Sequence, residues 1–399
     1  MSIPTKSEAA LDIMKKEYYP ETWTGGLHRV LCMQGGDDDG SYAKNSEAPA
    51  SAITLCKPML LTAIQSMKLF FNNNEEGADH DSLRIADLGC ATGYNTLATI
   101  DMVVESLRLR YAKECSLEPE FEAFFSDLPS NDFNSLFKSL SAKKSRNYYA
   151  AGVPGSFYYR LFAKRKLHIA VSLSALHWLS QIPDAVVDKA SPAWNKGRAW
   201  IDGAKEEVVE AYAKQSEKDM EDFLRCRKEE ILQGGILFML MGGRPGSQPP
   251  ENQLGDPDSR AKHPFTNSMD QAWQDLVNEG LIDEETRDGF NIPAYMRSME
   301  EVENAIRKCG GFEIQRMEYK TLVEHSEDKQ QEWIKDPVSY GRAKANLVRA
   351  TLRPIVEAHL GPYLSDQLFK RFEERVSSDF TLLHKTIFYG VIVVCAVRI

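Results

Sequence analysis

Short apolar runs alternate with longer amphipathic stretches along most of the chain. Runs rich in apolar, β-branched or aromatic residues, each of a length suited to one strand, occur at 83–89, 121–125, 167–173, 235–241 and 312–317. A longer β-branched and aromatic run at 386–397 predicts a final hairpin or a central strand. Strands that alternate with helical stretches are typical of an α/β fold with a largely parallel sheet and helices on both faces.

Several helical stretches do not belong to such a sheet. Charged segments with a helical pattern at 186–230, 269–287 and 340–375 predict helices outside the core. A sheet domain interrupted by helical insertions is expected to carry an α-helical cap. A cap of this kind suits a small-molecule site from which water is excluded.

Composition and charge exclude several classes of protein. The chain has 399 residues, 43% hydrophobic and 27% charged, as in ordinary soluble domains. Its net charge of −10 opposes binding to a phosphate backbone, so no nucleic-acid partner is expected. No apolar run approaches the roughly 18 residues that span a bilayer, so no membrane partner is expected and the cytosol is the expected compartment. Seven scattered cysteines without a CxxC pair indicate buried free thiols.

The first motif with chemical meaning closes the run at 83–89. Asp87 precedes a turn framed by Gly89 and Gly93, and a helix is expected from about Thr96. Glycines let backbone N–H groups approach a ligand closely, and a helix N-terminus adds partial positive charge. The missing middle glycine argues against the pyrophosphate of a dinucleotide. A plain strand-to-helix turn explains the same residues and stays open.

A second group of polar residues follows the run at 121–125. Asp127 stands where a carboxylate at the end of a second strand accepts the hydroxyls of a ribose. Asp132 is expected to cap the following helix. Ser156 and Phe157 then supply a hydroxyl and an aromatic ring, which suit contact with adenine or, equally, core packing.

Taken in order, these motifs resemble the plant SABATH carboxyl methyltransferases. The matching segments, which run almost end to end, are 33–36, 41–46, 86–90, 126–129, 153–158, 175–180, 194–197 and 290–293. Within the family, the stretches that look most like the gibberellin carboxyl methyltransferase branch are 36–39, 172–183, 261–265 and 279–290.

The resemblance implies the fold of an S-adenosylmethionine-dependent methyltransferase. This fold is Rossmann-like, with a seven-stranded, mostly parallel sheet and an α-helical cap built from insertions. We expect an N-terminal part with the cofactor-binding half of the core at 1–185, followed by a helical insertion at 186–233 and a core strand at 234–242. A helical cap is expected at 243–310, and C-terminal core strands with a further cap insertion at 311–399.

The resemblance also implies which residues bind the cofactor, S-adenosylmethionine. The positions that match the family's cofactor contacts are Ser46, Asp87, Asp127, Leu128, Ser156 and Phe157. Tyr42 and Asn95 are expected beside them and are counted with the cofactor site.

On the substrate side, Trp178 matches the position that holds the substrate carboxylate, and an indole N–H is a pure donor. His177 either touches the substrate or is a hydrogen-bonded core histidine. Tyr42 is expected to contact the substrate as well as the cofactor. The resemblance further implies a small carboxylic acid as substrate and a homodimer in the cytosol.

A magnesium ion is the one metal that the resemblance raises. Asn195, Phe290 and Asn291 match positions where some relatives hold Mg²⁺ away from the chemistry, but only two of them bring a side-chain oxygen. The exposed-looking run of aspartates at 37–39 is expected to be a solvated loop near the cofactor entrance.

Two substitutions depart from the family pattern. Pro49 replaces a glutamine that usually helps to tether the carboxylate, so Gln34 or Trp178 is expected to carry more of that task. Ser174 replaces an aromatic ring found in relatives that act on small aromatic acids, which leaves volume for a bulkier acid.

A carboxylic acid, with a pKa of about 4 to 5, is ionised at neutral pH, so methyl transfer to it needs no general base. A gibberellin is the expected acid. The open alternatives are another small acid (of the cinnamate or salicylate type, jasmonate, indole acetate or an iridoid acid), a ring nitrogen, or a non-catalytic hormone-binding protein. A nicotinamide-dependent oxidoreductase is disfavoured by the glycine pattern.

Overall fold

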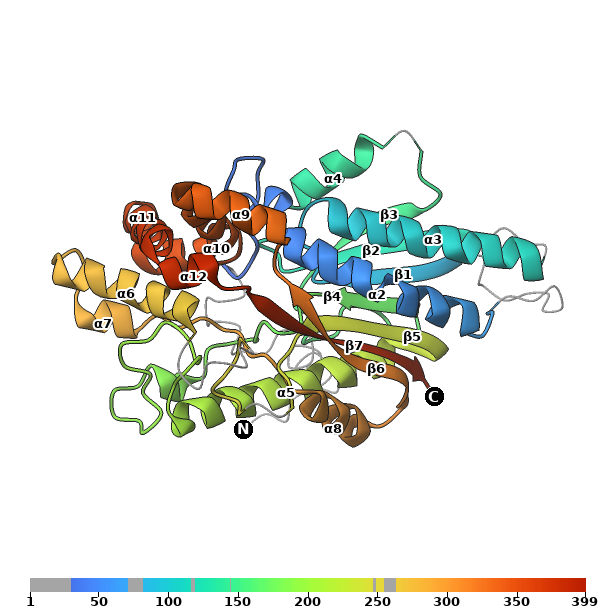
Figure 1. The fold of residues 1–399 in the computed structure, drawn as a ribbon. Helices are drawn as coiled ribbons and strands as arrows, with labels where there is room; N and C mark the ends of the chain where they lie inside the picture. Colours follow the sequence, from blue (N-terminus) through green and yellow to red (C-terminus); the bar gives the residue numbers. More distant parts are fainter. Residues whose placement is uncertain (1–29, 71–81, 116–118, 144, 247–248, 255–262) are drawn as a thin grey trace, which may run out of the picture.

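A seven-stranded sheet forms the centre of the molecule (Figure 1). The computed structural model describes residues 30–70, 82–115, 119–143, 145–246, 249–254 and 263–399, so residues 261–262 of one matching segment lie outside it. Listed across the sheet, the strands are β3 (Tyr149–Pro154), β2 (Glu120–Asp127), β1 (Ser82–Leu88), β4 (Leu167–Leu173), β5 (Ile231–Gly242), β7 (Phe388–Arg398) and β6 (Phe312–Val323). Six strands run in the same direction and β7 runs in the opposite direction, so the predicted mostly parallel sheet is confirmed.

Helices cover both faces of the sheet and one of its ends (Figure 1). The α-helices are α2 (Glu47–Ser66), α3 (Tyr94–Glu114), α4 (Phe133–Ser141), α5 (Glu206–Glu230), α6 (Pro264–Asn278), α7 (Glu284–Asp288), α8 (Met299–Cys309), α9 (Glu327–Lys335), α10 (Pro337–Leu360), α11 (Pro362–Ser378) and α12 (Phe380–His384). Helices α2 and α3 lie on one face, and α5 and α8 lie on the other. Helices α6, α7 and α9 to α12 gather at the end where the parallel strands point, and form the predicted cap.

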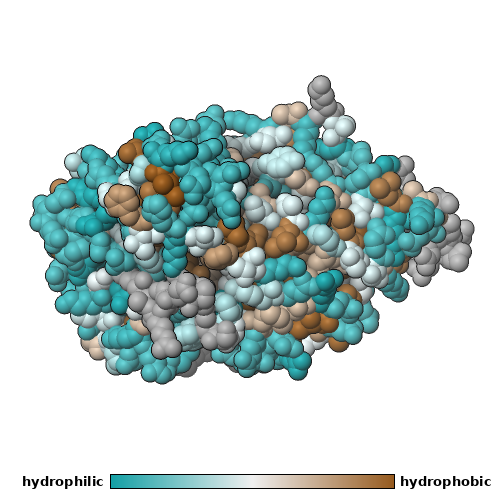
Figure 2. All heavy atoms as spheres, viewed as in Figure 1, coloured by the Kyte–Doolittle hydropathy of each residue, from teal (hydrophilic) through white to brown (hydrophobic). Residues whose placement is uncertain are grey.

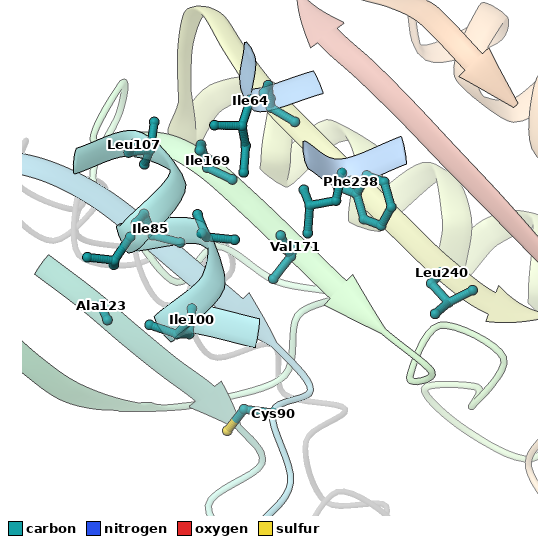
Figure 3. Close-up of a cluster of buried hydrophobic side chains, with 14 of the residues drawn as sticks. Ile64, Ile85, Cys90, Ile100, Leu107, Ala123, Ile169, Val171, Phe238 and Leu240 are labelled. Carbon is teal, nitrogen blue, oxygen red and sulfur yellow. The ribbon is translucent and has the colours of Figure 1, made fainter. Parts of the chain in front are cut away.

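The strands bury alternate side chains in two hydrophobic layers. Ile85, Ile169 and Val171 pack toward α2 and α3 in the cluster drawn in Figure 3. Ala86 and Ala170, their neighbours in the chain, belong to the cluster on the α5 and α8 side. This alternation follows from the two-residue period of a strand, and burial on both faces explains why these strands are continuous apolar runs.

Helix ends follow the local sequence. The Asp132 carboxylate accepts a hydrogen bond from the Ser135 N–H at 2.9 Å, so the predicted cap of α4 is confirmed. Ser298 and Glu301 form a reciprocal capping box at the start of α8. Gly361, with φ +78°, separates α10 from α11, which divides the helical stretch predicted at 340–375 into two helices.

Three elements differ from the sequence-based expectations. Residues 187–205 form turns and bends, so the helix expected across 186–230 begins only at Glu206. This helix, α5, was expected outside the core, but its apolar side chains pack against the sheet in a core cluster. Strand β3 was not predicted, because it is a short edge strand with mostly exposed side chains. The run at 386–397 forms the single strand β7, which pairs with both β5 and β6 and is not a hairpin. The division of the chain into five segments stays a prediction.

The surface and the cysteines agree with the composition. The face drawn in Figure 2 is mostly hydrophilic, with a group of hydrophobic residues near its middle. The seven cysteines, all within the described residues, form no disulfide, and the expected burial holds for four of them, while three are partly exposed. Within the described ranges, no helix has the length and apolar character needed to cross a membrane.

Ile85→Ala is expected to lower the free energy of unfolding by about 2–5 kcal/mol, because Ile85 is completely buried at the centre of β1 and its removal leaves a cavity. Urea denaturation measures the change. Leu109→Ala on α3 is the control, since Leu109 is 57% exposed and its loss should change stability by less than about 0.5 kcal/mol. Equal destabilisation by the two variants would contradict the assignment of Ile85 to the core.

Candidate active site

A cavity opens where the parallel strands β1, β2 and β4 end. It encloses about 950 Å³ of empty space, part of it open to solvent. Its wall combines the loops that follow β1, β2, β3 and β4 with segment 31–33, Tyr42 and the first two turns of α2. The predicted site residues that line it are Tyr42, Asp87, Asn95, Asp127, Leu128, Ser156, Phe157, Ser174 and Trp178. Ligands of open α/β sheets bind at this edge, beyond the carboxyl ends of the strands.

The turn after β1 requires glycine. Gly89 has φ +80°, and a Cβ at this position would overlap the Ala175 side chain and lie 3.2 Å from the Phe157 ring. Gly93, with φ +113°, precedes α3, which begins at Tyr94. At Gly89 the backbone therefore lines the cavity without a side chain.

Asp87 presents an unpartnered carboxylate oxygen at the end of β1. The residue is 2% exposed, and its Oδ2 accepts a hydrogen bond from the Thr96 hydroxyl at 2.5 Å. Among the described residues, its Oδ1 has no hydrogen-bond partner. Burial raises the pKa of this carboxyl to about 7, and the nearby charge of Asp127 adds to the effect. A cationic or hydroxyl-bearing ligand would satisfy this oxygen, which fits S-adenosylmethionine.

The Asp127 carboxylate is fixed by the backbone. Its two oxygens accept hydrogen bonds from the N–H groups of Ala91 and Leu128, each at 2.7 Å. Burial raises its pKa to about 6, while these two bonds lower it. Each oxygen keeps a further lone pair, so the carboxylate can still accept two hydroxyl groups of one ribose.

The remaining cofactor candidates differ in their position. Ser156 and Phe157 line the cavity, and the Phe157 ring meets the Tyr158 ring edge-on at 4.7 Å. Asn95 also lines it, and its Nδ2 donates to the Ser46 carbonyl at 3.2 Å. Ser46 itself is not part of the cavity wall, so its contact with the cofactor stays a prediction.

The N-terminal segment closes one side of the cavity. The Tyr42 N–H donates to the Gln34 carbonyl at 2.9 Å, and the Gln34 N–H donates to the Ala350 carbonyl of α10 at 2.8 Å. Gln34 therefore links the segment to the cap, but it lines neither this cavity nor the next one. The three aspartates at 37–39 are exposed, as expected for a solvated loop.

The loop after β4 carries the acceptor candidates. Ser174 adopts φ +58°, an uncommon conformation for a residue other than glycine, and its N–H donates to the Leu240 carbonyl at 2.7 Å. Trp178 lines the cavity, and no group in the described part of the chain accepts a hydrogen bond from its indole N–H. The Trp178 carbonyl is held by the Tyr158 hydroxyl, which donates to it.

A second cavity of about 610 Å³ adjoins the first and shares Pro49 and Ser174 with it. Its other lining residues are Ala48, Ala52, His177, Gly242, Gly243, Gln253, Leu254, Met296, Tyr389, Gly390 and Val391. Most of these were not predicted, because they come from β7 and from the segments after β5, where no motif marks them.

His177 lies in this second cavity. Its Nδ1 accepts the Gly242 N–H at 3.3 Å, which leaves the proton on Nε2. Burial and, to a smaller extent, the charge of Arg297 together lower the pKa of the imidazole to about 4. The ring is therefore neutral at pH 7, with one nitrogen bonded to the protein and an N–H donor left over.

The positions expected to hold magnesium are buried in the cap. The Asn195 amide donates to the Asn291 Oδ1 at 2.7 Å, and the Phe290 ring stacks on Trp273 at 4.7 Å. Asn195 Oδ1 has no partner among the described residues, so it is the one side-chain oxygen left for an ion. Within the described ranges, no three His, Cys, Asp or Glu residues group as metal ligands. The metal site stays a prediction.

The sheet order, the antiparallel β7 and the two carboxylates at the ends of β1 and β2 define the class of S-adenosylmethionine-dependent methyltransferases. The structure superposes on loganic acid methyltransferase with SAH with a TM-score of 0.78 and 34% identity, covering 92% of this chain and 98% of that one. The cofactor predicted for this chain is thereby confirmed.

The chain belongs to the SAM dependent carboxyl methyltransferase family, whose model matches residues 28–398. It is 60% identical over 382 residues to gibberellic acid methyltransferase 2 of Arabidopsis thaliana, covering 94% of this chain and 96% of the relative. It is 57% identical over 379 residues to gibberellic acid methyltransferase 1 of the same plant, covering 94% and 98%. The predicted SABATH resemblance and carboxyl methyltransferase activity are confirmed, against the ring-nitrogen and non-catalytic alternatives.

Cofactor affinity is expected to fall as pH drops from 8 to 6, because a cationic ligand needs the ionised form of Asp87, whose pKa is about 7 in the free protein. Protonation of one such group weakens binding by up to about tenfold per pH unit. Isothermal titration calorimetry with S-adenosylmethionine measures the dissociation constant at each pH.

Asp87→Asn should weaken binding at pH 8 and flatten this pH dependence, leaving only the contribution of Asp127 near pH 6. Asp37→Asn, in the exposed loop, should bind as the parent protein does. An Asp87→Asn variant that keeps both the affinity and its slope with pH would exclude Asp87 from the cofactor site.

Proposed function

We propose that this carboxyl methyltransferase forms the methyl ester of a gibberellin or a closely similar diterpenoid acid. The observation that carries the proposal is the identity of 60% and 57%, over almost the whole length of both chains, to two enzymes named for gibberellic acid. The enzyme named for loganic acid has the same fold, but its identity to this chain is only 34%.

The donor half of the site holds the cofactor through two carboxylates. When bound, S-adenosylmethionine supplies a methyl group attached to a positively charged sulfur. We propose that the Asp87 Oδ1, which is buried and has no partner among the described residues, accepts from a cationic or hydroxyl group of the cofactor. Asp127, oriented by the Ala91 and Leu128 N–H groups, accepts from the ribose hydroxyls. Ser156 and Phe157 border the adenine.

The acceptor half needs to orient a carboxylate that is already ionised. The Trp178 indole N–H is the donor proposed to tether it, because Trp178 lines the cavity and this N–H has no acceptor among the described residues. The Tyr42 hydroxyl is a second donor, since burial raises its pKa far above the physiological range and keeps it protonated. Pro49 stands in the first turn of α2, where a missing N–H breaks no helix bond, and it offers the carboxylate no donor.

The second cavity is proposed to receive the carbon skeleton of the acid. It lies beside Ser174, whose small side chain borders both cavities and leaves the space between them open. The neutral His177 would offer its Nε2–H to an oxygen on the skeleton. A flat aromatic acid has no need of this additional volume.

A panel of plant acids incubated with methyl-labelled S-adenosylmethionine tests the proposal. Gibberellins should give the highest kcat/KM, and the product methyl should be released by mild alkali, as expected for an ester. Turnover of salicylate, jasmonate, indole acetate or an iridoid acid with no turnover of gibberellins would overturn the substrate assignment and leave the carboxyl chemistry intact.

Trp178→Phe is expected to lower kcat/KM for the acid by about tenfold to a hundredfold, because the ring remains and the carboxylate loses one charge-assisted hydrogen bond. The dissociation constant of the cofactor should change by less than twofold. Trp194→Phe is the matched control, since Trp194 lines neither cavity and its indole N–H also has no described acceptor. Equal weakening of acid and cofactor would remove Trp178 from the acceptor half.

Ser174→Tyr is expected to reduce gibberellin turnover by at least tenfold while small aromatic acids are turned over as well as before or better, because the ring fills space between the two cavities. Ser174→Ala keeps the volume and should behave as the parent. The measurement is the ratio of kcat/KM for the two acids. An unchanged ratio in Ser174→Tyr would refute the volume argument.

A homodimer and a location in the cytosol are further proposals that rest on the family resemblance. Analytical ultracentrifugation of the purified chain tests the first, and fractionation of plant cells tests the second.

A further inference from the structure

One helix contacts both halves of the proposed site. Helix α5 lies on the face of the sheet opposite α2 and α3 (Figure 1). Two loops pack along it: the donor loop, residues 156–162, which follows β3, and the acceptor loop, residues 174–180, which follows β4. The donor loop carries Ser156 and Phe157, and the acceptor loop carries Ser174, His177 and Trp178.

The C-terminal end of α5 holds the donor loop through a buried ion pair. Arg227 and Glu230 are both completely buried and lie 2.7 Å apart. The Arg227 guanidinium donates to the Phe157 carbonyl at 2.7 Å and to the Tyr159 carbonyl at 2.9 Å. Glu230 Oε1 accepts the N–H groups of the next turn of the loop at 2.6 and 3.0 Å. The two side chains thus fix both ends of the donor loop.

Two turns earlier, Asp219 holds the acceptor loop. It is 1% exposed and accepts hydrogen bonds from the Ser180 N–H at 2.8 Å and the Ser180 hydroxyl at 2.6 Å. Gln215, one turn earlier on α5, donates to the same carboxylate at 2.8 Å. Arg297 braces the loop from the other side, where it donates to the Leu176 carbonyl and, at 3.0 Å, to the Ser216 carbonyl of α5.

This arrangement matters because the reaction has no acid–base step. Its rate depends on holding the donor and acceptor atoms in line at about 3 to 3.5 Å, and a displacement of about 1 Å lowers the rate strongly. Asp219 and Arg227 are eight positions apart, which corresponds to about 12 Å along a rigid helix. Both loops are attached to this helix by buried charged groups, whose bonds are costly to break.

We propose that Asp219, Arg227 and Glu230 are positioning residues, through which α5 sets the placement of the acceptor relative to the methyl donor. The inference rests on the proposed roles of the two loops. It goes beyond a general contribution to stability, because each of the two attachment points on the helix should control a different kinetic parameter.

Asp219→Asn is expected to raise KM for the acid, or lower kcat, by at least tenfold, with the cofactor dissociation constant unchanged within twofold. Arg227→Lys keeps the charge but loses the forked geometry, and it is expected to raise the cofactor dissociation constant at least fivefold. Calorimetry with S-adenosylhomocysteine gives the dissociation constant, and steady-state assays at saturating cofactor give kcat and KM for the acid.

Asp222→Asn is the matched control, since Asp222 lies on the same helix and pairs with Lys218 and Arg225 near the surface. It should leave all three parameters unchanged. If Asp219→Asn does not fold, Ser180→Ala decides the question: it removes one of the two bonds to Asp219 and should raise the acid KM about threefold without weakening the cofactor.

Loss of acid and cofactor binding in parallel in both variants would show a purely structural role and overturn the inference. So would unchanged acid kinetics in Asp219→Asn or Ser180→Ala when Trp178→Phe impairs them. If Trp178→Phe itself leaves acid kinetics intact, the proposed acceptor site is wrong, and the inference falls with it. The two failures are therefore distinguishable.

Discussion

The buried carboxylate of Asp87 is the constraint around which the site is arranged. One of its oxygens is bonded to Thr96, and the other has no partner in the described part of the chain. A buried, unpaired carboxylate is unfavourable unless a ligand satisfies it. The pKa of Asp87 is raised to about 7 because burial disfavours its ionised form. Two residues after Asp87 the turn requires a glycine, because a Cβ at Gly89 would overlap the Ala175 side chain and crowd the Phe157 ring.

A reaction without a general base places its demands on geometry. The acid arrives ionised, so the protein contributes alignment and a few well-placed donors. Apart from Asp87, which faces the cavity, the buried charged side chains near the proposed site hold loops and do not line the cavity: Asp219, Arg227, Glu230 and Arg297. The backbone of the acceptor loop is fixed by the Tyr158 hydroxyl and Arg297, besides its bonds to Asp219.

The acceptor loop also accounts for the division of space between the two cavities. Ser174 stands at its start in a left-handed conformation and borders both cavities, while His177 faces only the second. Pro49 borders both cavities from α2 without adding a donor. Substrate size and carboxylate orientation are thus proposed to depend on separate residues, Ser174 for size and Trp178 for orientation, which allows relatives in one family to take different acids with the same chemistry.

Local patterns in the sequence determined six of the seven strands (all but β3), the cap of α4, the carboxylates at the ends of β1 and β2, and the family. These features depend on hydrophobic period, turn chemistry and motif order, all of which are visible within short segments. Only the tertiary structure decided that β7 lies between β5 and β6, that His177 belongs to a second cavity, and that α5 holds both loops. Asp219 is 39 residues from Ser180, and Arg227 is 70 residues from Phe157. Their pairing is set by the packing of a helix against a sheet, because charged residues on an amphipathic helix have the same local pattern whether they face water or a buried carbonyl.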